Sequence, residues 1–396
     1  MSETIKTDVT IIGAGLVGLA AAVAMHQAGQ SVVVVDAKTP SKMEFADGHW
    51  DTRVYAISPR NAVWLASLGV WQHIKTARIG HMQAMEIFGD VDLKPLKLFA
   101  DDVNADDLGF IVEASALSQA LLSQIAARDI HTLFNAPCRA IQTSENSTKL
   151  TLENGQVIES TLLIAADSSQ SWVRGQLNLP LQHKSYEQSA IVANFKVEKS
   201  HGNIARQWFS ILEGKNSILA WLPLPESTIS IVWSVSTKLA ETLLLLNDDE
   251  FTAKVQNAGG AVLGDLNLIG MRAVFPLVMQ KADDYTQQSV VFMGDAAHKI
   301  HPMAGQGVNL GFRDVMDFMD VLQQKNSYQS INDASLLKRY RRKRKADMLN
   351  MLLLTDGLFQ LFESQNKLIK KVRYWGLSAT NLLGIKKMLV ENAIAL

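Results

Sequence analysis

A glycine-rich loop between two short β-strands constrains the fold more than any other feature of this sequence. Residues 8–12 are typical of a buried strand, and the residues that follow read Gly13-x-Gly15-x-x-Gly18. A helix is predicted over 19–28 and a second strand over 30–35, which ends at Asp36. This complete βαβ unit, with an acidic residue about 20 positions after the loop, predicts a dinucleotide-binding fold.

Each glycine of the loop has its own expected task. Gly13 permits the turn, Gly15 lets a pyrophosphate approach the backbone, and Gly18 lets the helix pack closely on the strand. Asp36 would accept a hydrogen bond from a ribose hydroxyl, and its charge would repel a 2′-phosphate. The loop therefore favours FAD or NAD and argues against NADP at this site.

A second motif occupies residues 294–314 and follows an apolar segment, 289–293, that is predicted to be a buried strand. Open α/β sheets bind ligands at the carboxyl ends of their strands. A helix is predicted to follow, so the backbone N–H groups of the loop would face an anionic or electron-rich group. Asp295 would accept from hydroxyl groups, which suits a polyol joined to a reducible ring. The alternative is a tight turn with a capping aspartate.

Further elements of the nucleotide fold are predicted between these motifs. Arg53 precedes a helix over 59–68 that ends at Gly69, and it could pair with a pyrophosphate or lie in a surface loop. A helix is predicted over 113–127, and strands over 149–152 and 162–166. The last strand leads into the segment 167–174.

The pattern changes to alternation of polar and apolar residues over 186–276, with strands predicted at 190–197, 205–212, 218–222 and 229–235. Strands and loops are also predicted over 80–107. A largely antiparallel sheet inserted here would form a lid over a ligand. The aromatic residues of this region could line a pocket or serve ordinary sheet packing; they are Trp208, Phe209, Trp221 and Trp233. Residues 259–264 are glycine-rich, but no strand precedes them, so a second nucleotide loop is not expected.

At 396 residues, the chain is long enough for two domains. The expected fold class is α/β: a discontinuous Rossmann-like domain (1–79, 108–182 and 277–330), an inserted, mainly antiparallel substrate domain (80–107 and 183–276), and a C-terminal helical region (331–396). The helical region carries a basic cluster over 339–345, followed by an apolar stripe. This cluster is interpreted as a solvated helix face or as a surface that attracts anionic lipid.

Composition excludes several classes of protein. A formal net charge of −1 gives no electrostatic case for nucleic acid. The single cysteine, Cys138, excludes an internal disulfide, a thiolate zinc cluster and a CxxC redox pair, and no metal site is expected. Residues 9–25 are apolar but shorter than a bilayer span. Without a recognisable secretory signal, a cytoplasmic location is expected, at most peripheral to the inner membrane.

Together these features resemble the group A flavoprotein aromatic hydroxylases, which share the fold of para-hydroxybenzoate hydroxylase. The resemblance rests on the glycine loop, Asp36, Arg53, residues 167–174 and residues 294–295. Residues 298–314, 222–224 and 355–359 are similar to the ubiquinone-biosynthesis hydroxylases within that group. The sequence departs from the family at Ser168, where a glycine is usual, and at Ala114-Ser115, where relatives often carry an asparagine-arginine pair.

The resemblance implies FAD, bound through its ADP part at residues 13–36, with Arg53 near the pyrophosphate and flavin and Asp295 on the ribityl chain. The backbone of residues 305–309 would face the pyrimidine edge of the flavin. The implied cofactor-binding residues are Gly13, Gly15, Gly18, Asp36, Arg53, Asp167, Asp295, Pro302, Gly305, Gly307, Val308 and Asn309. No side chain is assigned as catalytic, and the nearest candidates are His298, His301 and Pro302.

The implied reaction is hydroxylation of a polyprenylated phenol in ubiquinone biosynthesis by a flavin hydroperoxide, with O2 and a transiently bound NAD(P)H. The alternatives are another FAD-dependent reductase or dehydrogenase of an aromatic or isoprenoid substrate, and a non-catalytic nucleotide-binding scaffold. The C-terminal region would contact a membrane surface or a ubiquinone-biosynthesis complex.

Overall fold

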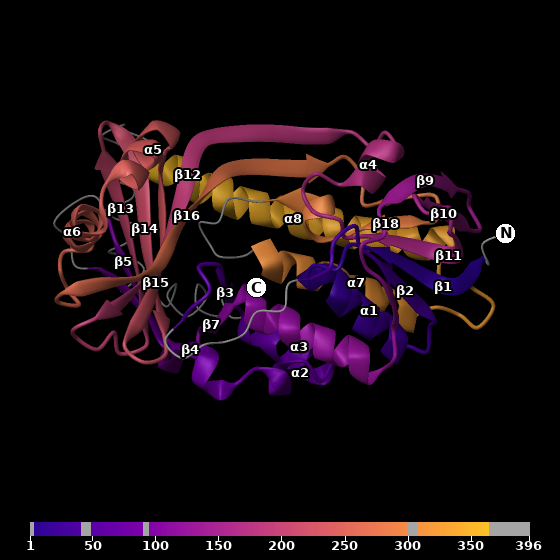
Figure 1. The fold of residues 1–396 in the computed structure, drawn as a ribbon, viewed down its shortest axis with the longest axis horizontal. Coiled ribbons are helices and arrows are strands. Elements are labelled where there is room, and N and C mark those ends of the chain that lie inside the picture. The colour runs from indigo at the N-terminus through magenta and orange to yellow at the C-terminus, as the bar shows by residue number, and fades with distance from the viewer. Residues whose placement is uncertain (1–3, 41–48, 90–94, 300–306, 364–396) are drawn as a thin grey trace.

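Three β-sheets and the helices packed on them form the part of the chain that the structure describes, residues 4–40, 49–89, 95–299 and 307–363. In this computed structural model the two large sheets lie toward opposite ends of an elongated molecule (Figure 1). Strands β12 (Leu181–Val197) and β16 (Leu266–Ala282) run from one end to the other. The expected α/β architecture with an inserted antiparallel sheet is confirmed.

The first sheet has the strand order β17-β18-β11-β1-β2-β8. Strands β18, β11, β1, β2 and β8 pair in parallel, and in the predicted βαβ unit Val9 pairs with Val32. Strands β9 and β10 extend from β11. The bounds are β1 (Ile5–Ile12), β2 (Val32–Val35), β8 (His131–Leu133), β9 (Cys138–Thr143), β10 (Thr148–Leu152), β11 (Val157–Ala165), β17 (Thr286–Gln287) and β18 (Val290–Phe292).

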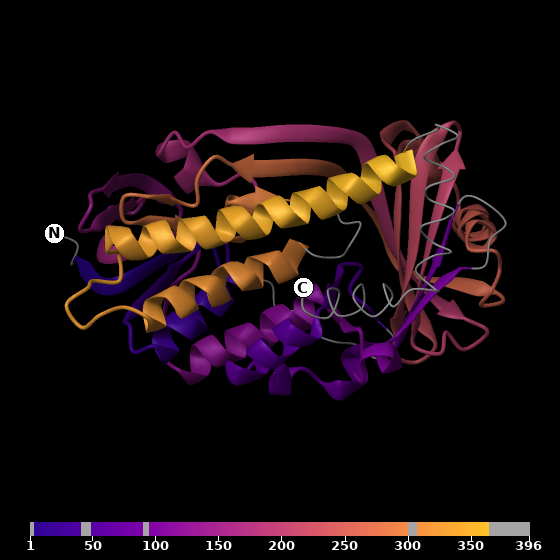
Figure 2. The same cartoon turned by 180° about the vertical axis from the view of Figure 1, so that it is seen from behind.

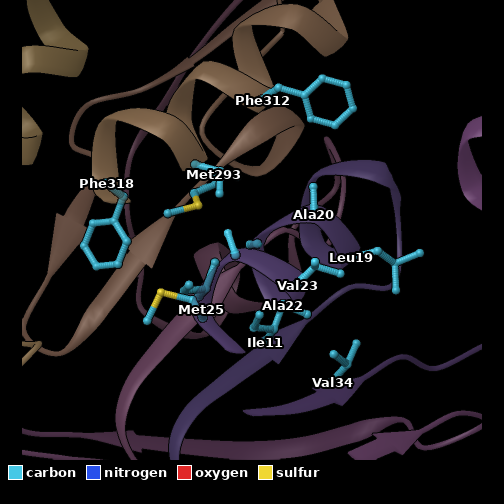
Figure 3. Packing of buried hydrophobic residues seen from close by; sticks show 14 of the residues in the cluster. Ile11, Leu19, Ala20, Ala22, Val23, Met25, Val34, Met293, Phe312 and Phe318 are labelled. Atoms are coloured by element: carbon cyan, nitrogen blue, oxygen red, sulfur yellow. The ribbon is translucent and has the colours of Figure 1, made fainter. Parts of the chain in front are cut away.

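The helices that pack beside this sheet bury its apolar face. Helix α1 contacts both α3 and α7, and α7 contacts α8. Figure 3 shows the shared core, to which β1, α1, α7 and the residue after β18 contribute Ile11, Val23, Phe318 and Met293. Figure 2 shows α8 crossing the back of the molecule. The bounds are α1 (Leu16–Gln27), α2 (Pro59–Ser67), α3 (Ala114–Ala127), α4 (Trp172–Gln176), α7 (Gly307–Gln323) and α8 (Ala334–Glu363).

The second sheet has the order β19-β16-β12-β15-β14-β13-β5-β6. The four strands predicted over 186–276 are present, and β12 and β16 extend well beyond the predicted alternation. The bounds are β5 (Ala84–Phe88), β6 (Leu96–Phe99), β13 (Ile204–Leu212), β14 (Lys215–Leu224), β15 (Thr228–Ser236) and β19 (His298–Lys299). A third sheet, ordered β3-β7-β4, lies between the large ones; it comprises β3 (Val54–Ile57), β4 (Ile79–Met82) and β7 (Gly109–Glu113).

Two helices that the sequence analysis did not predict cover the outer face of the second sheet: α5 (Thr237–Leu245) and α6 (Asp248–Ala258). Ser236 caps α5, and Asn247 forms a capping box with Glu250 at the start of α6. Since α6 rather than a strand precedes the glycines at 259–264, the expectation that these residues are not a second nucleotide loop is confirmed.

Three tryptophans of the second sheet point toward these helices. Trp221 and Trp233 are 1% and 2% exposed in the core shared with α5 and α6, and Trp208 packs against the same core. The Trp208 and Trp221 rings lie 4.8 Å apart. Of the two expected alternatives, ordinary sheet packing holds for these three indoles, and they do not wall a cavity over the cofactor. Alternation shows that residues share a face of a sheet, but it does not show which face meets the nucleotide domain.

The opposite face of the sheet meets the rest of the molecule. Asn194 donates hydrogen bonds to the Trp50 and Asp51 carbonyls at 3.3 and 3.0 Å. Leu222 and Leu224 pack with Trp50 and β7. Two rows of residues that pair across β12, β15, β14 and β13 continue this inner face. They are Ala190–Ser234–Ile218–Phe209 and Val192–Val232–Ala220–Gln207. The inner face is thus built mainly from small and apolar side chains.

The backbone at Ser168 adopts a conformation that favours glycine. Its φ is 76°, in the left-handed region. An L-residue there costs about 1–2 kcal/mol, and glycine costs about 0.4–1 kcal/mol in unfolded-chain entropy. Ser168→Gly should therefore raise the free energy of unfolding by roughly 0.5–1 kcal/mol, measured by urea denaturation. Ser169→Gly, at a position without positive φ, should destabilise slightly; equal effects of the two substitutions would refute the explanation.

The C-terminal region is only partly described. Helix α8 contains the basic cluster, as expected, whereas residues 364–396 lie outside the described residues. Residues 355–359 lie within α8. No described helix has the length and apolar character needed to cross a bilayer.

Candidate functional site

Two of the three loop glycines are required by the packing of the protein itself. Gly13 has φ +109°, and a Cβ atom there would lie 2.3 Å from the Ala166 carbonyl oxygen. A Cβ atom at Gly18 would lie 2.0 Å from the Gly13 carbonyl oxygen. Gly13 therefore permits the turn and the approach of β11, and Gly18 permits the close packing of α1, as predicted.

Gly15 differs, because none of the described residues requires glycine there. Its φ of −76° is open to any residue, and no atom of the described residues lies within 4 Å of a Cβ built at this position. It directly precedes α1, whose first backbone N–H groups donate no hydrogen bond to a capping side chain. A helix N-terminus beside open space is a site for an anion such as a pyrophosphate.

Asp36, at the end of β2, turns its carboxylate toward the glycine loop. One oxygen accepts from the Ala14 N–H at 2.7 Å, and the other accepts from the Lys38 N–H at 2.8 Å. A carboxylate has about four acceptor positions, so capacity for a ribose hydroxyl is left. The side chain is half-buried beside the proposed pyrophosphate position.

The second motif meets the glycine loop at Val17. A Cβ atom on Gly294, whose φ is +58°, would lie 3.1 Å from a Val17 methyl carbon, and one on Gly311 would lie 2.5 Å from it. Glycine at both positions allows β18 and α7 to approach α1 this closely. Asp295 is half-buried between buried Gly294 and Ala296, and its carboxylate has no hydrogen-bond partner among the described residues. An unused acceptor therefore stands beside the loop.

The segment 167–174 closes on the same turn through Arg174. Its guanidinium donates to the Ala296 carbonyl at 2.8 Å and to the Ser169 carbonyl at 2.7 Å. Asp167 accepts from the Val173 N–H at 3.0 Å, while its other oxygen is buried without a partner. Burial raises the pKa of the Asp167 carboxyl, against hydrogen bonds from Ser171 and backbone N–H groups.

Arg53 is exposed, and its guanidinium carbon lies 5.3 Å from the centre of the Tyr55 ring. Burial raises the pKa of Tyr55, Arg53 opposes the rise, and the carboxylates of Asp295 and Asp51 add to it. Tyr55 thus stands among Arg53, Asp51 and Asp295. The sequence analysis did not single out Tyr55 as a site residue. Its position two residues after Arg53, in the segment before a predicted helix, could have indicated that it lies near the site.

The residues that hold the Arg53 segment were also missed. Glu113 accepts from the Asp51 N–H at 2.6 Å and from two nitrogens of Arg78 at 2.6 and 2.7 Å. Asp51 in turn accepts from the Ser115 N–H at 3.1 Å. The start of α3, where the sequence departs from the family, is therefore tied to Asp51 by a backbone group.

Asn309 fixes the beginning of α7. Its side-chain oxygen accepts from the Ser58 N–H at 3.1 Å and from the Asn61 amide at 2.7 Å, and its amide donates to the Ala56 carbonyl at 2.7 Å. The side chain is committed to the protein, consistent with a contact made by the backbone. Gly307 is exposed and Val308 is 8% exposed. Pro302 and Gly305 lie outside the described residues.

His298 is 2% exposed and bonds through Nε2 to the Asp314 carboxylate at 2.7 Å. Its ring centre lies 6.0 Å from that of Tyr285. These contacts give His298 a structural role behind the turn at residues 294–297. His301, the other histidine candidate, lies outside the described residues.

Cys138 packs against the main core, and burial raises the pKa of its thiol to about 12. A thiol so far from ionisation is a poor nucleophile and a poor metal ligand. Among the described residues, no group of three or more His, Cys, Asp or Glu side chains could hold a metal ion.

Aspartates pair with four cations of the basic cluster of α8, one of which is buried. Arg344 is 0% exposed and pairs with three aspartates, while Lys343 pairs with two. Arg341 and Lys345 both pair with Asp284. Arg344 thus lies inside the molecule, whereas Arg342, Lys343 and Lys345 remain on a solvated face of α8, as expected. Acids of α7 and of the loop before β17 offset part of the charge of this face, and its attraction to anionic lipid stays a prediction.

Comparisons with known proteins agree with this geometry. Residues 6–352 match the family described as FAD binding domain. The chain is 31% identical to the 3-demethoxyubiquinol 3-hydroxylase of Escherichia coli (strain K12), with 96% of both chains covered. It is 32% identical to the ubiquinone hydroxylase UbiL of Rhodospirillum rubrum, with 98% of this chain and 89% of the relative covered.

Solved structures show the same fold at low sequence identity. The p-nitrophenol 4-monooxygenase PnpA of Pseudomonas putida superposes with a TM-score of 0.77 at 16% identity, and 98% of both chains is covered. HpxO of Klebsiella pneumoniae, solved with FAD and uric acid, superposes with a TM-score of 0.74 at 17% identity over 99% of this chain and 96% of that one.

The fold and the loops around Val17 define an FAD-dependent monooxygenase. The residues present suit the cofactor: open space at Gly15, an uncapped helix N-terminus, and acceptors at Asp36 and Asp295. The chain belongs to the FAD-binding domain family and, within it, to the ubiquinone-biosynthesis hydroxylases.

Proposed function

We propose that this protein hydroxylates the aromatic ring of a polyprenylated phenol in ubiquinone biosynthesis. The observation that carries the proposal is the meeting of the glycine loop and the turn at Gly294 on Val17, which builds one cofactor site from two distant motifs. The substrate class is inferred from relatives named as ubiquinone and demethoxyubiquinol hydroxylases. The phenol, O2, NAD(P)H and a proton would yield the hydroxylated phenol, water and NAD(P)+.

Each part of the site would hold one part of FAD. The first N–H groups of α1 beside Gly15 would bind the pyrophosphate, and Asp36 would accept from the adenosine ribose. Asp295 would accept from the ribityl hydroxyls, with Arg53 nearby. The N-terminus of α7 would stabilise negative charge on the reduced ring system. When bound, the flavin supplies the redox chemistry that activates dioxygen.

The protein's remaining tasks would be to orient the phenol and exclude water. The inner face of the second sheet suits both, because the paired residues that include Val192 and Ala190 place small and apolar side chains on the side of the sheet toward the nucleotide domain. We place the substrate domain at 80–107 and 183–276, and the FAD domain at 1–79, 108–182 and 277–330. No proton-transferring side chain is assigned.

Substitution of the charged side chains that are proposed to contact FAD should weaken cofactor binding. Asp36→Ala, Arg53→Ala and Asp295→Ala should each lower FAD affinity roughly ten- to a hundredfold, because each deletes a charge-assisted partner worth about 1.5–3 kcal/mol. Asp283→Ala is the matched control, because Asp283 is an exposed acid between β16 and β17 whose carboxylate accepts from Gln182. Flavin content of the purified proteins, read from absorbance, decides the matter. Equal occupancy in all variants would refute the assignment.

Peripheral contact with the inner membrane or with a biosynthetic complex is also proposed, because a polyprenylated phenol would be nearly insoluble in water. The ion pairs that join α8 to Asp284 and Asp314 reduce the electrostatic part of such contact. Binding should therefore depend mainly on apolar burial and change little with salt, which liposome sedimentation at two ionic strengths would show.

A further inference from the structure

Buried charged side chains hold the peptide groups on both sides of Asp295. Before it, the Gly294 N–H donates to Asp314 at 2.7 Å. After it, the Ala296 carbonyl accepts from Arg174 at 2.8 Å. Asp314 and Arg174 are 0% and 7% exposed. The half-buried carboxylate of Asp295 therefore projects from a turn whose two ends are fixed independently.

Asp314 is itself held from a more distant helix. Its second oxygen lies 2.6 Å from Nε of Arg344 on α8, and His298 bonds to the first oxygen at 2.7 Å. Arg344 also pairs with Asp317 at 2.6 Å and with Asp347 at 2.7 Å. Contacts thus run without a gap from α8 through α7 to the residue before Asp295.

The charged groups around Asp314 keep it ionised. Burial alone would raise its pKa, but Arg344 and His298 hold the pKa of Asp314 below its usual value. An ionised carboxylate accepts from the Gly294 N–H more strongly than a protonated one. The other ionisable groups near Asp314 and Arg344 are Arg313, Asp317, Tyr285, Tyr340 and Asp347.

Packing of the helices does not require these buried ion pairs of Arg344 with Asp314, Asp317 and Asp347. Apolar residues already join α7 to the sheet, as Phe318 and Met293 do in Figure 3. Phe318 also packs on Tyr340 with ring centres 5.3 Å apart. Buried ion pairs add little net stability compared with well-packed apolar residues. The ion pairs instead fix the orientation of the Asp314 carboxylate oxygen that accepts from the Gly294 N–H.

We propose that Arg344 is a positioning residue for Asp295: acting through Asp314, it fixes the 294–296 turn so that the Asp295 carboxylate meets the ribityl hydroxyls of FAD. This inference rests on the proposed FAD site. Arg344 itself touches neither cofactor nor substrate. Its effect on FAD should therefore pass entirely through Asp295.

The test is a double-mutant cycle on FAD release. Diluted holoenzyme is followed by the fluorescence of freed FAD, for the parent, Arg344→Met, Asp295→Ala and the double variant. Arg344→Met should weaken FAD about tenfold in the parent and less than about twofold in the Asp295→Ala background. A merely destabilising substitution would weaken FAD equally in both backgrounds, and that result would overturn the inference.

Controls separate the possible failures. Arg341→Met removes a charge from the same helix, but Arg341 pairs with Asp284 at 3.2 Å and should leave FAD release unchanged. If Arg344→Met does not fold, Arg344→Lys takes its place in the cycle, with a smaller effect expected in the same direction. If Asp295→Ala alone leaves FAD binding intact, the proposed cofactor site fails and this inference fails with it. If Asp295→Ala weakens FAD but Arg344→Met does not, only the inference fails.

Discussion

Gly15→Glu should abolish FAD binding, by more than about a hundredfold in affinity, while leaving the apoprotein as stable as the parent. The backbone at Gly15 is open to any residue, and a Cβ atom there meets no atom of the described residues within 4 Å. Glutamate would instead fill the space beside the N-terminus of α1 and repel the pyrophosphate. Flavin absorbance of the purified protein and thermal unfolding of the apoprotein measure the two effects separately.

The neighbouring glycines provide the contrast. Gly18→Ala places a Cβ atom 2.0 Å from the Gly13 carbonyl oxygen, so it should destabilise the apoprotein itself by roughly 3 kcal/mol. Loss of flavin with loss of stability is thus expected at Gly18, and loss of flavin alone at Gly15. A Gly15→Glu protein that purifies with a full complement of flavin would show that the pyrophosphate lies elsewhere.

A phenol that lacks the prenyl tail should be hydroxylated at least about a hundredfold less efficiently in kcat/KM than the prenylated one. Burial of the tail is worth about 0.8 kcal/mol per methylene, so a few buried carbons supply this difference. A ring that is poorly held also leaves the site open to water, so more reduced nicotinamide should be consumed without product.

A series of phenols with tails of increasing length is the control for this effect. Efficiency, and the ratio of product to nicotinamide consumed, should rise together until the apolar surface is filled. If the phenol without a tail matches the prenylated one in both quantities, the inner face of the second sheet does not bind the tail.

The cofactor half of the fold could be predicted because its signals are local. The glycine loop, Asp36 and the strands beside them lie within one short segment, and the positions of their side chains follow from the βαβ geometry. The motif at Gly294 was recognisable for the same reason. The structure adds that the two motifs touch at Val17, a contact that neither segment contains by itself.

The sequence left open the surroundings of side chains whose partners are distant along the chain. Trp221 could line a pocket or serve sheet packing, and packing holds because α5 and α6 cover that face of the sheet. Arg344 belongs to a continuous basic run, yet it is buried against Asp314 and Asp317 on another helix. One signal was available: Asp314 lies four residues after Leu310 on the buried stripe of α7, where an acid needs a buried partner.

The departures from the family pattern have different consequences. Ser168 adopts the left-handed backbone that glycine would adopt, so the turn is kept at a cost in strain. At the second departure, Ala114-Ser115, the Ser115 N–H donates a hydrogen bond to the Asp51 carboxylate. The backbone is therefore tied to the Arg53 segment by a contact that no side-chain motif reveals.

The origin of the new oxygen atom tests the central claim most directly. The holoenzyme is supplied with NAD(P)H, a prenylated phenol and 18O2 in ordinary water, and the product is analysed by mass spectrometry. A monooxygenase must place one 18O atom in each new hydroxyl group and must stop when oxygen is removed. Oxygen derived from water, or turnover of the phenol without oxygen, would contradict the account and would identify a dehydrogenase or reductase on the same fold.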